Sequence, residues 1–221
     1  VKYNLDIVED AAHALGATYN DGSRVGNCQY SNMTIFSFHP VKGIAAGEGG
    51  MITTNDYSLY RKLTLLRSHG ITKGNFEFPG ISEADNSLIN KDDALENGEL
   101  KRWYYEMQSL GFNYRITDIQ SALAISQMDK IDLFLGARRS MVKAYDKGFK
   151  DIPNITPLQA HGRDNSSHHI YVVSIEFDKI GMTRHQFMEK LAEQGVGSQV
   201  HYIPVVSQPY YQGIGYSVEQ Y

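Results

Sequence analysis

One lysine stands where an amine can do chemistry. Lys42 is the only charged residue between Phe38 and Gly47, in a loop of small residues that follows a strand-like run. Burial in such a loop lowers the pKa of an amine and makes it a usable nucleophile. The pattern indicates a Schiff-base lysine for a carbonyl substrate or for pyridoxal phosphate. An ordinary solvated lysine is the alternative that the spacing leaves open.

A carboxylate stands where it can serve the same cofactor. Asp10 closes the apolar run 3–9, and ligands of open α/β sheets bind outside the carboxyl ends of strands. A carboxylate there can keep a pyridinium nitrogen protonated, which is the electron-sink state that pyridoxal phosphate needs. The alternative is that Asp10 is the N-cap of a helix that follows it.

A histidine and a serine complete this set. His13 lies near the face of Asp10 if a helix begins there. Ser37, five residues before Lys42, is close enough for its hydroxyl to bind a phosphate oxygen while the amine reaches an aldehyde. A structural histidine and an ordinary strand serine remain open as alternatives.

The eight histidines raise the question of a metal site. His168 and His169 are adjacent on a predicted strand, so they should point to opposite faces and not hold one ion together. The sequence contains no H-x-x-x-H or H-E-x-x-H spacing, and no P-loop, G-x-S-x-G or G-x-G-x-x-G motif. We therefore expect no metal.

The strands that position these residues are predicted from apolar and β-branched runs bounded by Gly, Asn and Asp. The first is expected to be short and buried. A cluster of Asn, Asp, Gly and Ser predicts a turn, and proline with four glycines excludes a regular element around Lys42. The expected strands are residues 3–9, 33–38, 50–54 and 168–177, with the turn at 20–27 and the irregular loop at 39–50.

Capping patterns predict where the helices begin and end. Asn55 and Asp56 are N-cap residues ahead of leucines at helical spacing, and Thr117 and Thr183 each precede a glutamine by three residues, as in a capping box. Residues 72–102 are polar and show no period, which predicts a surface excursion. The expected helices run from Asp56 to a C-cap at Gly70, from Thr117 to about Lys150 with an interruption at Gly136 and an end at Pro153 and Pro157, and from Thr183 through Leu191 to Gly195.

Composition and charge narrow the class of protein. With 42% hydrophobic and 21% charged residues in 221 positions, the chain is not disordered, collagen-like or a coiled coil. A formal net charge of −4 leaves no basic excess for a nucleic-acid backbone. No window has the roughly 20 apolar residues of a membrane span, and no targeting peptide opens the sequence. With a single cysteine, Cys28, we expect a soluble, cytoplasmic protein without nucleic-acid or membrane partners.

Both ends predict that the sequence belongs to a longer chain. Val1 opens almost directly into an apolar run, and residues 216–221 stop without a helix or a charged tail. We therefore expect that part of the active site lies outside these residues.

Four stretches in order carry a family pattern: IVEDAAHALGA (7–17), FSFHPVKGIAAGEGGMITTND (36–56), LRSHGI (66–71) and WYYEMQSLGFNYRITDIQSALAISQMDKID (103–132). Together they resemble the pyridoxal-phosphate sugar aminotransferases of the DegT/StrS type. HHIYVVSIEF (168–177) and VHYIPVVSQPYY (200–211) are most similar to the branch of the pseudaminic-acid pathway.

The resemblance implies a fold. It is the α/β fold-type I of pyridoxal-phosphate-dependent transferases, similar to aspartate aminotransferase, with a partial large domain and a small α+β C-terminal domain. Residues 1–115 would belong to the large domain, 116–150 to a linking helix and 151–221 to the small domain. An N-terminal part of the large domain, with a phosphate loop and a ring-stacking aromatic residue, would precede them.

The resemblance also implies roles for single residues. Lys42 matches the lysine that binds the aldehyde of pyridoxal 5'-phosphate, Asp10 the carboxylate on the pyridinium nitrogen, and His13 the residue beside the phenolic oxygen. Ser37 matches a phosphate ligand. Asn113 matches an asparagine that reaches the phosphate of the neighbouring subunit's cofactor, which implies a homodimer with a shared active site.

The implied reaction moves an amino group from glutamate to the 4-keto carbon of a nucleotide-linked 4-keto-6-deoxy sugar, with UDP as the expected nucleotide. Arg115, His169 and Tyr202 match positions near the nucleotide sugar. Another 3- or 4-keto sugar-nucleotide aminotransferase, or a non-catalytic scaffold on the same fold, is the alternative. Pyridoxamine-dependent sugar dehydratases resemble this chain but have histidine at the position of Lys42, which argues against that reaction.

Overall fold

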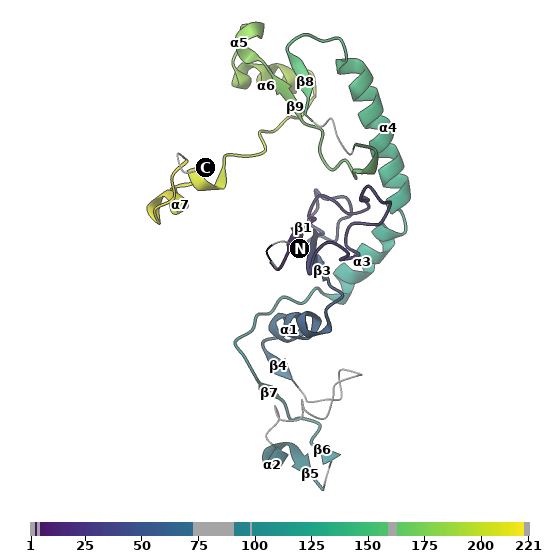
Figure 1. Cartoon of the computed structure of the whole chain (residues 1–221), viewed down its shortest axis with the longest axis vertical. Helices are drawn as coiled ribbons and strands as arrows, with labels where there is room; N and C mark the ends of the chain where they lie inside the picture. The colour runs from purple at the N-terminus through teal and green to yellow at the C-terminus, as the bar shows by residue number, and fades with distance from the viewer. Residues whose placement is uncertain (1–2, 4, 73–90, 98, 159–162, 219–221) are drawn as a thin grey trace. The chain divides into compact units, whose positions relative to one another are not determined.

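The computed structural model describes residues 3, 5–72, 91–97, 99–158 and 163–218. The chain divides into two compact units, Val1–Lys147 with Gln159–Val172, and Gly148–Leu158 with Val173–Tyr221. No helix among the described residues is long and apolar enough to cross a membrane. Figure 1 shows the elements in chain order.

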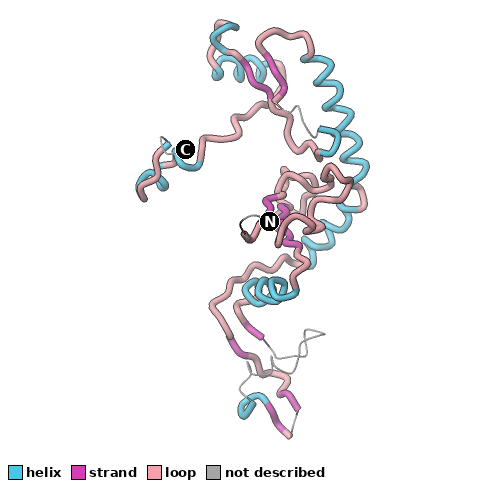
Figure 2. The backbone as a smooth tube through the Cα atoms, in the orientation of Figure 1, coloured by secondary structure: helices cyan, strands magenta, loops and turns pink. Residues whose placement is uncertain are grey.

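A three-stranded mixed sheet forms the centre of the first unit (Figure 2). It consists of β1 (Val8–Asp10), β2 (Met33–Ser37) and β3 (Gly50–Thr53), in that order. β1 runs parallel to β2, and β3 runs antiparallel to it. The strands predicted at 33–38 and 50–54 and the irregular loop between them are confirmed, whereas the strand predicted over 3–9 is found only at Val8–Asp10. The prediction of a buried first strand is wrong, because β1 lies at the sheet edge and Val8 is 51% exposed.

One face of this sheet is packed and the other is open. Because side chains alternate along a strand, Thr34 and Phe36 point to the packed face, where both are buried. Ile35 points to the opposite face, and it is exposed there together with Ile52 of β3. The core on the packed face consists of Ala11, Phe36, Phe38, Ile44, Ala46 and Ala124.

Helix α1 (Tyr57–Arg67) begins after the predicted N-cap Asp56, but its C-cap is Ser68, two residues before the predicted Gly70. The carboxylate of Asp56 accepts hydrogen bonds from the backbone N–H groups of Ser58 and Leu59, so two of the unpaired donors at the helix start are satisfied. After the helix, Gly70 has a φ of 67°, a left-handed conformation that glycine adopts without a steric cost.

The segment after α1 pairs with a later stretch of chain. β4 (Ile71–Thr72) is antiparallel to β7 (Glu106–Met107). Between them, the excursion predicted to lack regular structure contains three short elements, so that prediction is wrong for residues 91–100, while residues 73–90 lie outside the described chain. The three are α2 (Lys91–Ala94), β5 (Leu95–Glu96) and β6 (Glu99–Leu100).

The long helix predicted from Thr117 is two helices, α3 (Asp118–Met128) and α4 (Ile131–Phe149). The capping box of Thr117 is present. The interruption lies at 129–130 and not at Gly136, because the N–H of Asp129 bonds back to Ile125 and closes the first helix, while a single exposed glycine costs a helix only about 1 kcal/mol. α4 ends at Phe149, ahead of both prolines.

The second unit contains a two-stranded antiparallel sheet and short helices. The strand predicted over 168–177 is only three residues long, because the carbonyl oxygens of His168 and His169 accept from Arg138 instead of a neighbouring strand. The capping box at Thr183 is confirmed, and Gly195 follows the helix with a φ of 75°. The elements are β8 (Ile155–Pro157), β9 (Val173–Ile175), α5 (Phe177–Ile180), α6 (Arg184–Glu193), η4 (Val205–Ser207) and α7 (Pro209–Gly213).

Candidate active site

Asp10 ends β1 and begins a chain of turns. Its carboxylate Oδ1 accepts a hydrogen bond of 3.0 Å from the backbone N–H of Ala12. Residues 11–17 form consecutive turns, closed by the bonds from Ala14 N–H to Ala11 O and from Ala17 N–H to Ala14 O. The alternative of a helix N-cap is therefore wrong, and the exposed carboxylate of Asp10 retains acceptor capacity for a ligand.

The strand register places Asp10 and Ser37 on one face of the sheet. Asp10 is paired with Ile35, and paired residues of neighbouring strands point to the same side. Ser37 is two residues further along β2 and so shares that side. This is the open face of the sheet, so both side chains are available to a ligand lying over it.

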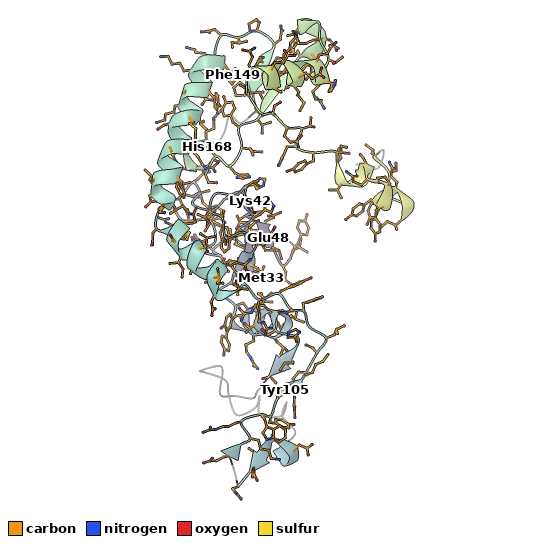
Figure 3. All side chains as sticks on the ribbon, turned by 180° about the vertical axis from the view of Figure 1, so that it is seen from behind. Met33, Lys42, Glu48, Tyr105, Phe149 and His168 are labelled. Carbon is orange, nitrogen blue, oxygen red and sulfur yellow. The ribbon has the colours of Figure 1, made fainter. Side chains whose placement is uncertain are left out.

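Lys42 lies on the loop that follows β2 (Figure 3). Backbone hydrogen bonds hold the two ends of this loop together. The backbone of Phe38 donates to Gly49 O and accepts from the N–H of Ala46, both at 2.9 Å. Within the loop, the N–H of Lys42 closes a turn by donating to His39 O at 2.9 Å. The side chain of Ile44 is buried in the core. The half-buried Lys42 therefore stands on a loop anchored at both its ends and its middle.

A pocket beside this loop joins three of the predicted site residues. Its polar lining includes His13, Ser37, Arg138, Ser167 and His169, and Gly43 lies next to Lys42 in its wall. The ring centroids of His13 and His169 are 4.1 Å apart, with the rings tilted by 41°. The structure therefore brings His13, Ser37 and His169 to one pocket.

The loop 163–169 reaches this pocket from a distant part of the chain. Ser167 Oγ donates a 2.7 Å hydrogen bond to His13 O, and Thr18 N–H donates to Asn165 O at 2.9 Å. The prediction that two histidines lie on a strand is wrong, since His168 has a φ of 50° in a loop. Sequence reasoning missed Ser167 and Arg138, because no local pattern marks contacts across 154 residues, as for Ser167, or 30 and 31 residues, as for Arg138.

Asn113 and Arg115 lie on the segment that pairs with the end of α1. Asn113 forms an isolated antiparallel bridge with Ser68, and Nη2 of Arg115 is 3.3 Å from Nε2 of His69. Both predicted residues are exposed. His69 was missed by the sequence analysis, although it stands in the LRSHGI stretch.

This segment leads directly to the end of the lysine loop. Gln120 Nε2 donates to Glu48 O at 3.0 Å. A Cβ added to Gly49 would lie 2.9 Å from Ile116 Cδ1, so the chain after Arg115 packs tightly on the loop. Tyr202, the remaining predicted residue, is exposed in the second unit.

Two glycines permit the pairing that holds Asn113. A Cβ added to Gly111 would lie 2.1 Å from Gly70 N, a backbone atom that has no room to move. We expect Gly111→Ala to lower the free energy of unfolding of the full-length protein by about 1–3 kcal/mol, measured by urea denaturation. Gly136→Ala is the control, since a Cβ there meets open space and should stabilise α4 by about 1 kcal/mol. Equal stabilities of the two variants would contradict the close backbone contact.

The sequence is similar to known proteins along nearly its whole length. A family model described as the DegT/DnrJ/EryC1/StrS aminotransferase family matches residues 1–220. A Helicobacter pylori protein named UDP-4-amino-4,6-dideoxy-N-acetyl-beta-L-altrosamine transaminase is 34% identical over 211 residues, which are 96% of this chain and 48% of that protein. The chain thus spans about half the length of the curated relatives it matches.

The fold is similar to that of solved aminotransferase structures. The structure of Helicobacter pylori PseC, an aminotransferase of pseudoaminic acid biosynthesis, superimposes with a TM-score of 0.77 at 31% identity and covers 98% of this chain and 50% of that one. The pyridoxal-phosphate form of the putative sugar aminotransferase Spr1654 from Streptococcus pneumoniae gives a TM-score of 0.74 at 30% identity, covering 98% of this chain and 48% of that one. The predicted fold, fold-type I of the pyridoxal-phosphate-dependent transferases, is confirmed.

Proposed function

Because the chain belongs to the DegT/DnrJ/EryC1/StrS aminotransferase family, we propose that it is part of a pyridoxal-phosphate-dependent aminotransferase that moves an amino group from glutamate to the 4-keto carbon of a nucleotide-linked 4-keto-6-deoxy sugar. One observation carries this proposal. Asp10 and Ser37 share the open face of the sheet, and the loop that leaves β2 after Ser37 presents Lys42.

The residues present fit pyridoxal phosphate. The donor set contains an amine for an aldehyde, a carboxylate for a ring nitrogen and a hydroxyl for a phosphate. A Cβ added to Gly43, beside Lys42, would meet no other atom within 4 Å, so the backbone next to Lys42 is open on this side. In this proposal Lys42 holds the aldehyde, Asp10 the pyridinium nitrogen, Ser37 a phosphate oxygen, and His13 lies beside the phenolic oxygen.

Each of these residues has a distinct task. When bound, the cofactor supplies an electron sink for the electron pair released at the carbon that carries the amine. Nζ of Lys42 takes the proton from the α-carbon of glutamate and later returns a proton to the sugar carbon, acting as base and then as acid. The carboxylate of Asp10 holds the ring-nitrogen proton in place. Ser37 holds the phosphate group of the cofactor in place. The amine of Lys42 therefore reaches the same carbon in both half-reactions.

The nucleotide sugar is the finer part of the proposal. Arg115 is assigned to it because a guanidinium suits a diphosphate, and His169 because it lines the pocket. Tyr202 is assigned to it from the family pattern alone. The domain roles are also proposed, with residues 1–115 in the large domain, 116–150 as the link and 151–221 in the small domain.

The experiment that tests the reaction uses the full-length protein. It is incubated with glutamate and a panel of UDP-, GDP- and dTDP-linked 4-keto sugars, and 2-oxoglutarate and the amino sugar are measured. We expect turnover with a UDP-linked sugar, as the name of the Helicobacter pylori relative suggests. Formation of a 3-amino sugar would favour the alternative 3-keto activity, and the absence of turnover and of bound cofactor would favour a scaffold.

We also propose that the full-length protein is a homodimer with a shared active site. In the sequence, a run of exposed large apolar side chains precedes and flanks Asn113, the residue assigned to the partner's cofactor. Side chains with this exposure and aromatic content are typical of interface cores. The run consists of Trp103, Tyr105, Met107, Leu110, Phe112 and Tyr114.

A charge in this run should separate the subunits. Phe112 is 51% exposed and stacks on Tyr114 with ring centroids 4.7 Å apart. We expect Phe112→Glu to weaken dimerisation about 100-fold, since a hot-spot residue contributes about 2 kcal/mol or more and a buried carboxylate is disfavoured. Sedimentation velocity measures the dimer fraction. Met141→Glu on α4, a residue 54% exposed, should leave the dimer unchanged; dimerisation that survives Phe112→Glu would contradict this interface.

A further inference from the structure

One guanidinium nitrogen of Arg138 holds the backbone turn at His168 and His169. Arg138 lies half-buried in α4, and its Nη1 donates to His168 O at 3.2 Å and to His169 O at 3.1 Å. The chain bends sharply there, with a φ of 50° at His168. A guanidinium stays protonated at all physiological pH values, and charge-assisted hydrogen bonds are about twice as strong as neutral ones. Arg138 therefore fixes the course of the loop at these two residues.

This loop braces His13 from two directions. The ring of His169 lies against the ring of His13, with 4.1 Å between the centroids. The hydroxyl of Ser167, which is 6% exposed, donates to the carbonyl oxygen of His13 at 2.7 Å. One contact orients the imidazole and the other holds its backbone. The position of His13 is thus set by a loop that follows it by more than 150 residues.

Helix α4, which carries Arg138, packs against the turns that follow His13. Leu135 is buried, and a Cβ added to Gly16 would lie 2.6 Å from its Cδ1. Leu135 and Arg138 are three residues apart and so share one face of the helix. Because Leu135 is seated on the residues that follow His13, the guanidinium, the loop and the histidine form one packed assembly in the first unit.

We propose that Arg138 is a positioning residue, which acts through the backbone of His168 and His169 to hold the imidazole of His13 toward the cofactor ring. The inference rests on the proposed function and goes beyond it, since that function assigns Arg138 no contact with cofactor or substrate. Burial lowers the pKa of His168, which agrees with a neutral ring beside the arginines. The loop would loosen without this guanidinium, because two carbonyl oxygens would lose their charged donor.

The test compares Arg138→Met, Arg138→Lys and Lys143→Met in the full-length holoenzyme. Lys143 is an exposed lysine of α4, so its variant removes an equal charge from the same helix. Amide hydrogen exchange of residues 166–169 reports on the loop. The visible absorbance band of the bound cofactor reports on His13 beside the phenolic oxygen, and kcat reports on the reaction.

We expect Arg138→Met to accelerate exchange at 166–169 about tenfold or more, to shift the absorbance band and to lower kcat about tenfold. Arg138→Lys, which retains an ammonium donor, should recover most of each loss, and Lys143→Met should match the wild type. Faster exchange with an unchanged band and kcat would overturn the inference while the proposed function stands. Equal losses in Lys143→Met would overturn it as well.

The same full-length protein also distinguishes failure of the proposed function from failure of the Arg138→Met variant to fold. If the wild-type protein binds no cofactor at Lys42, the proposed function fails, and the positioning role fails with it. If Arg138→Met does not fold, Ser167→Ala replaces it, because that variant removes only the hydrogen bond to His13 O. An unchanged absorbance band and kcat in Ser167→Ala would then overturn the inference, and a shift in both would support it.

Discussion

Replacement of Lys42 by alanine is expected to abolish amine transfer and to leave the fold intact. The amine is the proposed attachment point for the cofactor and the base and acid of both half-reactions, and loss of such a group costs at least about 10³-fold in rate. The loop itself is held by Ile44 in the core and by the backbone bonds of Phe38. These contacts do not involve the side chain of Lys42, so the stability should be preserved.

The measurement for Lys42 has two parts. Rates of 2-oxoglutarate formation compare Lys42→Ala with the wild type, and borohydride reduction followed by peptide mass spectrometry identifies the lysine that carries the cofactor. Lys62→Ala, which removes an exposed lysine of α1, is the matched control and should keep full activity. An active Lys42→Ala enzyme, or a cofactor reduced onto another lysine, would rule out the assignment.

Asp10→Asn is expected to lower kcat about 10²–10³-fold, which is the cost of removing a preorganised electrostatic partner. The amide has the shape of the carboxylate and can still accept the hydrogen bond from Ala12 N–H. It carries no charge, however, and so does not hold a proton on the pyridinium nitrogen. The loss should therefore fall on the reaction and not on the folding of the turns.

Asp21→Asn is the control for Asp10. Asp21 is an exposed aspartate of the same unit, and hydrogen bonds from Ser23 lower its pKa to about 2. It lies in the turn 20–27 and has no part in the proposed chemistry, so its variant should retain the wild-type kcat. If Asp10→Asn is as active as Asp21→Asn, the carboxylate does not serve the ring nitrogen.

Local signals were enough to predict most elements of this chain. The capping boxes at Thr117 and Thr183 are present, since a cap involves residues only three apart. The strands around the lysine loop follow from short apolar runs, and the irregular loop from its glycines. The first strand, predicted over 3–9, is confined to Val8–Asp10. It was also wrong in burial, because the burial of a strand depends on its neighbours in the sheet, and β1 lies at the edge.

The candidate site also contains residues that the sequence predicted and residues that only the tertiary structure revealed. The residue types and spacing of Lys42, Asp10 and Ser37 predicted, from the sequence alone, an amine, a carboxylate and a hydroxyl for the proposed cofactor. Only the tertiary structure decided that Asp10 and Ser37 share a face, because the parallel register of β1 and β2 sets it. It also decided that Arg138 donates to the carbonyl oxygen of His169 and that Ser167 donates to that of His13. Contacts across 30 to more than 150 residues depend on how whole elements pack, and no local pattern records them.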